Sequence, residues 1–137
     1  MEVSEINRQS VTNSTNSLNS VLVVEDDPGM NKLVCRNLQK EGFTVQSALT
    51  AADALEIIYR DPGLLLILDY RLPDMTGTEL IEKLKAEQYD MHFIVMTGFG
   101  DQKIAVEIMK LGARDYIVKD LDFIEHLPLL INRTLNR

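Results

Sequence analysis

Four short apolar runs of this sequence are each followed at once by a charged or hydroxyl side chain, where a β-strand would end. The acidic run 25–27 (Glu-Asp-Asp) follows the first run, Asp69 follows the third, Thr97 the fourth and Lys119 the fifth. Carboxylates held close together repel one another unless a cation lies among them, and Mg²⁺ suits a few carboxylates and water best. These residues therefore indicate a divalent metal site beside a lysine ammonium and a hydroxyl group.

Asp69 is the strongest candidate for a reactive side chain. It follows the apolar run 64–68, so it stands where a buried strand reaches water. An aspartate in a loop is often a turn or cap residue, but Asp74 and Thr76 are better placed to cap the next helix. A carboxylate beside a metal and a lysine is suited to accept a phosphoryl group, forming an aspartyl phosphate.

Taken singly, the other residues have plainer interpretations. Asp27 before Pro28 is typical of a helix cap. A lone Lys119 would be a solvated surface lysine, and a lone Thr97 an ordinary β-branched strand residue. The chemical interpretation therefore depends on all of these groups meeting at one place in the fold.

Alternating apolar runs and helical spacings predict five strand–helix units from residue 21 onward. Strands are expected at 21–24, 43–48, 64–68, 92–96 and 115–118. Helices are expected to begin near residues 28, 51, 76 and 101, and the last at Pro128 after a short turn at 122–126, because proline interrupts a helix interior. Each helix joins two strands, so the strands are expected to be parallel.

This order predicts an α/β fold in which right-handed crossovers place helices on both faces of one open sheet. Ligand sites of such sheets form outside the carboxyl ends of the strands. The rule selects the same strand-end residues that carry the chemistry, so Glu25, Asp26, Asp69, Thr97 and Lys119 are expected to converge.

Composition limits the function classes further. The 137 residues carry 21 acidic and 14 basic side chains, a net charge of −7, which argues against binding nucleic acid or an anionic membrane. No apolar run approaches the roughly 20 residues of a membrane span, and no secretion signal is evident. We expect a soluble cytoplasmic domain at 20–137, preceded by a flexible, Ser/Thr/Asn-rich extension at 1–19.

Three residue types that often carry chemistry are not assigned a role. Because Cys35 is the single cysteine, an intrachain disulfide or a cysteine zinc site is excluded, and we expect a packed or half-packed side chain. His92 and His126 are far apart in the sequence, and no nucleophile pattern accompanies them. No glycine-rich nucleotide-binding motif follows any of the strands.

Four segments resemble the receiver domain of bacterial two-component response regulators. They are VLVVEDD (21–27), LDYRLPDMTG (68–77), VMTG (95–98) and GARDYIVK (112–119). The resemblance covers residues 20–137 and implies a flavodoxin-like, five-stranded parallel sheet of order 2-1-3-4-5.

The resemblance also implies a metal and a phosphoryl donor. Asp69 would accept a phosphoryl group from a phosphohistidine of a sensor histidine kinase or a phosphotransfer protein. Asp26 and Asp69 would ligate Mg²⁺, with the main-chain carbonyl of Arg71 as a further ligand, and Glu25 would act through water. Lys119 would bind the phosphoryl oxygens.

A conformational switch is implied as well. Thr97 would also bind the phosphoryl oxygens, and Tyr116 matches an aromatic position that turns inward on activation. The domain would be a regulatory phosphoacceptor in a phosphorelay, with self-catalysed phosphotransfer and slow autodephosphorylation, and not a metabolic enzyme.

The sequence departs from the family at three places. Asp120 stands where most members have proline after a cis bond, so we expect a trans bond or a strained loop. Arg71 and Phe99 occupy positions that influence dephosphorylation in the family, and their bulk predicts a long-lived phosphoryl state. The extension at 1–19 lies outside the family core.

Alternative functions remain open at this point. A Mg²⁺-dependent phosphohydrolase of the haloacid dehalogenase type also uses an aspartate after a parallel strand, but it usually needs a second aspartate where Arg71 stands. A degenerate receiver would act only as a binding module. The output is open too: the chain is either a single-domain regulator or, as the opening of the last helix slightly favours, part of a longer parent with an output domain beyond Arg137.

Overall fold

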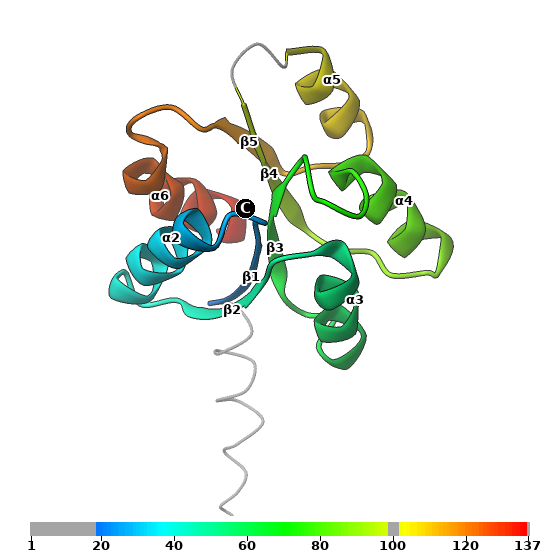
Figure 1. Ribbon diagram of the computed structural model, residues 1–137, viewed down its shortest axis with the longest axis horizontal. Helices are drawn as coiled ribbons and strands as arrows, with labels where there is room; N and C mark the ends of the chain where they lie inside the picture. Colours follow the sequence, from blue (N-terminus) through cyan, green and yellow to red (C-terminus); the bar gives the residue numbers. More distant parts are fainter. Residues whose placement is uncertain (1–18, 99–101, 137) are drawn as a thin grey trace, which may run out of the picture.

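The computed structural model describes residues 19–98 and 102–136, which alternate strand and helix five times (Figure 1). The strands are β1 (Ser20–Val24), β2 (Thr44–Ala48), β3 (Leu65–Asp69), β4 (Phe93–Thr97) and β5 (Asp115–Val118). The helices are α2 (Pro28–Lys40), α3 (Ala51–Arg60), α4 (Gly77–Ala86), α5 (Gln102–Lys110) and α6 (Phe123–Leu135). The strands pair in parallel in the order β2-β1-β3-β4-β5, which confirms the predicted fold class and strand order.

The helices cover both faces of the sheet. Helices α2 and α6 lie on one face, and α3, α4 and α5 lie on the other (Figure 1). All five residues of the central strand β3 are buried, since Leu66 and Leu68 face α3 and α4 while Leu65 and Ile67 face α2 and α6. This two-sided burial explains why the run is apolar at every position.

Side-chain caps define where helices α2 and α4 begin. Asp27 caps α2, accepting hydrogen bonds from the backbone N–H groups of Gly29 and Met30 at 2.9 and 3.2 Å, as expected. Of the two candidates for capping α4, Thr76 is the cap and forms a capping box with Glu79. The other candidate, Asp74, binds the first turn of α3 instead.

The prediction that the last helix begins at Pro128 is wrong. Helix α6 runs unbroken from Phe123 to Leu135 with Pro128 buried inside it. A proline in a helix interior leaves the carbonyl four residues earlier without its usual donor. Here that carbonyl belongs to Ile124, and the side-chain Nδ2 of Asn37 on α2 donates to it at 2.7 Å. A side chain from another helix thus replaces the missing backbone donor.

Smaller differences concern the strand ends. Strand β2 begins at Thr44 rather than at residue 43, and β3 and β4 each extend one residue further than expected, to Asp69 and Thr97. Both of these candidate site residues are therefore the last residues of buried strands. Between residues 19 and 136, leaving aside 99–101, the structure has no helix that is long and apolar enough to cross a membrane.

The contact between Asn37 and Ile124 predicts a coupling with Pro128. Asn37→Ala should lower the free energy of unfolding by about 1–3 kcal/mol, because a partly buried carbonyl loses its donor. In a Pro128→Ala background the alanine N–H can bond to Ile124, so the same substitution should cost measurably less. Urea unfolding of the four proteins in this double-mutant cycle measures the difference, and equal costs in both backgrounds would reject the explanation.

The contacts of Asp74 predict a pH dependence of stability. Partial desolvation opposes ionisation of this carboxyl group, but hydrogen bonds from the Ala51 and Ala52 N–H groups hold its pKa below the ordinary value. Its ionised form therefore contributes stability above about pH 4, and the contribution is lost as the pH falls through the folded-state pKa. The difference in unfolding free energy between wild type and Asp74→Ala should shrink in that acidic window. A difference that stays constant there would contradict this.

Candidate functional site

An open depression lies where β1, β3 and β5 end. Within the described residues its lining consists of Glu25, Asp26, Asp27, Asp69, Tyr70, Arg71, Gly98 and Lys119. The acidic run 25–27 follows β1, Asp69 is the last residue of β3, and Lys119 follows β5. Residues that are far apart in the sequence meet here because all five strands point the same way.

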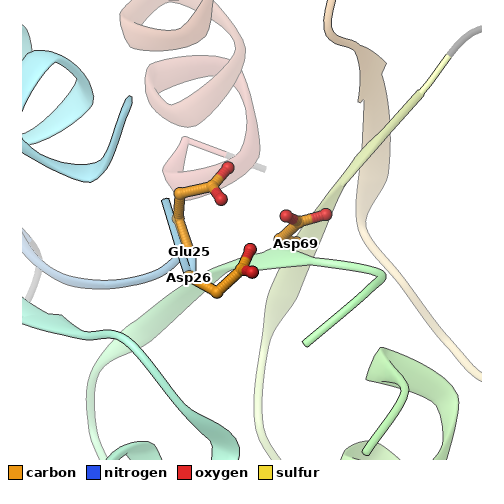
Figure 2. A group of neighbouring side chains, drawn as sticks. All are labelled: Glu25, Asp26 and Asp69. Carbon is orange, nitrogen blue, oxygen red and sulfur yellow. The ribbon is translucent and has the colours of Figure 1, made fainter. Parts of the chain in front are cut away.

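Three carboxylates form the acidic part of the site. Glu25, Asp26 and Asp69 each offer an oxygen atom, and these atoms lie within 4.8 Å of one another. Figure 2 shows the carboxylates of Asp26 and Asp69 turned toward each other, with that of Glu25 beside them. Glu25 and Asp69 are only 1% and 7% exposed, whereas Asp26 is exposed. Two of the three charges are therefore poorly screened by water.

Lys119 joins two of these carboxylates. Its Nζ donates to Glu25 Oε1 at 2.5 Å and to Asp69 Oδ2 at 2.9 Å. Burial alone would lower the pKa of Lys119, but the two hydrogen bonds outweigh it and raise the pKa above its ordinary value. The lysine is therefore charged at neutral pH, and it offsets one of the three negative charges.

The third carboxyl group of the site, that of Asp26, has a raised pKa. Desolvation is the largest cause that raises the pKa of this carboxyl group. A hydrogen bond that its protonated form donates to Glu25, and the repulsion between the two charges, raise it further, although Lys119 acts in the opposite direction. Three carboxylates and one ammonium leave two negative charges uncompensated. Oxygen ligands with that charge excess fit a divalent hard cation such as Mg²⁺.

Backbone groups hold the two buried carboxylates in place. Glu25 Oε2 accepts a hydrogen bond from the N–H of Asp27 at 3.0 Å. Asp69 Oδ1 accepts one from the N–H of Arg71 at 3.3 Å. Each acid thus has one oxygen bound to Lys119 and the other oriented by the loop that follows it.

Among the candidate site residues, Thr97 and Tyr116 do not line this depression. Thr97 is the last residue of β4 and is 2% exposed, and its carbonyl accepts the Lys119 N–H at 2.8 Å. Tyr116, on the edge strand β5, is 39% exposed. The structure therefore shows the aromatic side chain on the outside of the sheet.

The structure describes Asp120 and Arg71, two of the residues at which the sequence departs from the family. All described peptide bonds are trans, including that between Lys119 and Asp120. The Asp120 N–H donates to the carbonyl of Val118 at 2.8 Å, a bond that proline could not make. The guanidinium of Arg71 lies 5.6 Å from the centre of the Tyr70 ring at the rim of the depression. Phe99 lies outside the described residues.

Asn31 is a site-supporting residue that the sequence analysis missed. It is buried, and its Nδ2 donates to the carbonyls of Glu25 at 3.0 Å and Ala48 at 3.2 Å, tying the acidic loop to the end of β2. The signal was present, because Asn31 lies on the same helix face as the buried Val34 and Leu38. A polar residue in an apolar stripe needs a partner.

The residues left unassigned lie elsewhere. His92 Nε2 is 3.0 Å from an Arg114 guanidinium nitrogen, before the start of β4 and so at the opposite edge of the sheet. His126 is on α6 beside Leu129 and Arg133. Cys35 is half-buried on α2, and burial raises the pKa of its thiol.

Comparisons with known proteins agree with this architecture. The family model of the response regulator receiver domain matches residues 21–130. The acid tolerance regulatory protein ActR of Rhizobium meliloti is 34% identical over 114 residues, which are 83% of this chain and 59% of that protein. The transcriptional regulatory protein FixJ of Azorhizobium caulinodans is 38% identical over 103 residues, 74% of this chain and 48% of that protein. The chain thus spans about half the length of these relatives.

Solved structures agree as well. The crystal structure of FixJ-N superposes with a TM-score of 0.78 at 32% identity, covering 86% of this chain and 94% of that one. A response regulator receiver domain protein from Clostridium thermocellum gives a TM-score of 0.78 at 27% identity over the same shares. Together with the strand order and the acidic residues at the strand ends, these matches establish that the chain belongs to the response regulator receiver domain family.

Proposed function

We propose that this domain is a phosphorylation-activated signalling switch in which Asp69 accepts a phosphoryl group from a phosphohistidine. The donor would be a sensor histidine kinase or a phosphotransfer protein. The observation that carries the proposal is the Lys119 ammonium bound to Asp69 and Glu25 beside the acidic group of Asp26. Receiver-family membership favours this function over an aspartate-nucleophile phosphohydrolase.

The residues present fit a magnesium ion. Asp26, Asp69 and the main-chain carbonyl of Arg71 would hold it directly, and Glu25 would act through water. When bound, the metal supplies charge neutralisation for the incoming phosphoryl oxygens. The two uncompensated negative charges of the site support this assignment.

The phosphotransfer step follows from the positions of the side chains. An Asp69 carboxylate oxygen forms a bond to phosphorus while the bond from phosphorus to the histidine nitrogen breaks, and the imidazole keeps the electron pair. Lys119 can stay hydrogen-bonded to the phosphorylated side chain and offset its charge. Buried Glu25 binds the same Lys119 ammonium and so would hold it next to Asp69.

A conformational response is part of the proposal. Thr97, one strand away from Asp69, would move toward the phosphoryl group, and Tyr116 would turn from its exposed position into the space that is vacated. The partner-binding surface around α5, β5 and α6 would change with it. The exposed Tyr116 corresponds to the resting state in this scheme.

The setting of the domain is proposed in the same terms. A domain at 20–137 would act in the cytoplasm, and the extension expected at 1–19 lies, apart from its last residue, outside the described residues. The relatives are longer than the matched region, which supports an output domain that continues beyond Arg137 in a longer parent. Arg71 at the rim would restrict the attacking water and lengthen the lifetime of the phosphoryl group.

Phosphoryl acceptance has a direct test. With Mg²⁺ and a small acyl phosphate, the wild-type protein should gain the mass of one phosphoryl group, and Asp69→Asn should gain none, because the amide is not a nucleophile of comparable strength. Intact-protein mass spectrometry measures both. Asp90→Asn, which changes an exposed aspartate that does not line the depression, is the matched control and should still be labelled. Equal labelling of Asp69→Asn and wild type would exclude Asp69 as the acceptor.

The metal assignment predicts a loss of affinity on removal of one ligand. Asp26→Asn should weaken Mg²⁺ binding by at least about tenfold, because the site loses a charged ligand that is exposed toward the ion. Calorimetric titration measures the dissociation constant. Glu82→Gln removes one negative charge from an exposed position on α4 and serves as the control. If both variants bind Mg²⁺ like the wild type, Asp26 is not a ligand.

A further inference from the structure

Asp74 belongs to the loop between β3 and α4, yet its carboxylate binds a different helix. Oδ1 accepts a hydrogen bond from the N–H of Ala51 and Oδ2 one from the N–H of Ala52, both at 2.9 Å. These donors belong to the first turn of α3, whose N-terminus favours a negative charge. The helix also has its own cap, because Thr50 Oγ1 accepts from the N–H of Asp53 at 3.1 Å. Asp74 therefore links two elements in addition to capping one.

The loop that carries Asp74 is closed tightly at its base. The N–H of Gly77 donates to the carbonyl of Tyr70 at 2.6 Å, and Arg71 forms an antiparallel bridge with Thr76. A Cβ atom on Gly77 would lie 3.3 Å from the Cα of Tyr70, so the two strands of the loop approach closely. A displacement of Asp74 would therefore also displace Arg71, whose N–H donates a hydrogen bond to Asp69.

The start of α3 is also tied to the acidic loop. The carbonyl of Ala48, which precedes the helix, accepts hydrogen bonds from the Glu25 N–H at 3.1 Å and from Asn31 Nδ2 at 3.2 Å. The short stretch 48–52 thus bonds to the loop bearing Glu25 and Asp26 on one side and to the loop following Asp69 on the other. It connects the two halves of the site by direct hydrogen bonds.

We propose that Asp74 is a positioning residue for the metal and phosphoryl site. It fastens the loop that follows Asp69 to the stretch 48–52 and so fixes the separation between the two groups of oxygen ligands. Mg²⁺ requires near-ideal octahedral geometry, so a small displacement of ligands lowers its affinity. This inference rests on the proposed function, because it takes Asp26, Asp69 and the Arg71 carbonyl as ligands.

The test compares two ways of weakening the same helix terminus. Asp74→Ala removes the link and the two hydrogen bonds to α3, whereas Thr50→Ala removes the helix's own cap and leaves the link in place. Calorimetric titration of the full chain with MgCl₂ should show the dissociation constant rising about tenfold in Asp74→Ala and staying within about twofold in Thr50→Ala. Asp74→Asn keeps one acceptor oxygen and should give an intermediate value.

A second measurement needs no metal. Amide hydrogen exchange of the metal-free proteins should be faster in residues 70–77 of Asp74→Ala than in wild type, and unchanged there in Thr50→Ala. If Asp74→Ala and Thr50→Ala alter Mg²⁺ affinity equally, or neither alters it, Asp74 is only a helix cap and the positioning role is wrong. If the wild type takes up neither Mg²⁺ nor a phosphoryl group, the proposed function fails and this inference fails with it.

Discussion

The organisation of the site depends on the shared ammonium group of Lys119. It lies between two carboxylates that are almost completely buried, Glu25 and Asp69, and without it their charges would be uncompensated in a poorly solvated environment. One ammonium does not balance three acids, so the three carboxylates could hold a further cation. In the proposed function, a phosphoryl group added to Asp69 would change this charge balance.

The parallel sheet brings these charged groups together. Two cores, one on each face of the sheet, bury the three central strands β1, β3 and β4 almost completely, and the polar residues at the carboxyl ends of the strands meet at one edge. The connections around that edge are fastened by side-chain hydrogen bonds over long separations in sequence, from Asn31, Asp74 and Lys119. Hydrogen bonds of the loops, and not the strands alone, therefore hold the site residues in position.

The sequence predicted what local patterns determine. Apolar runs marked the strands, and the residues directly after them, Asp69 and Lys119 among them, are the ones that meet. It failed where the deciding partner is remote. Pro128 was expected to begin a helix because proline interrupts a helix interior. The expectation failed because the donor that replaces the missing backbone bond, Asn37, lies on another helix. The contact of Asp74 with α3 was missed for the same reason, since a cap from 22 or 23 residues away leaves no periodic signal.

The most direct measurement is a crystal structure of the domain loaded with Mg²⁺ and beryllofluoride, a mimic of the phosphoryl group. The mimic should be bonded to an Asp69 carboxylate oxygen, with the metal against Asp26 and Asp69 and the Lys119 ammonium within hydrogen-bonding distance of a fluorine atom. Beryllofluoride bound at another side chain, or Lys119 turned away from it while the metal lies elsewhere, would contradict the central role assigned to these three residues.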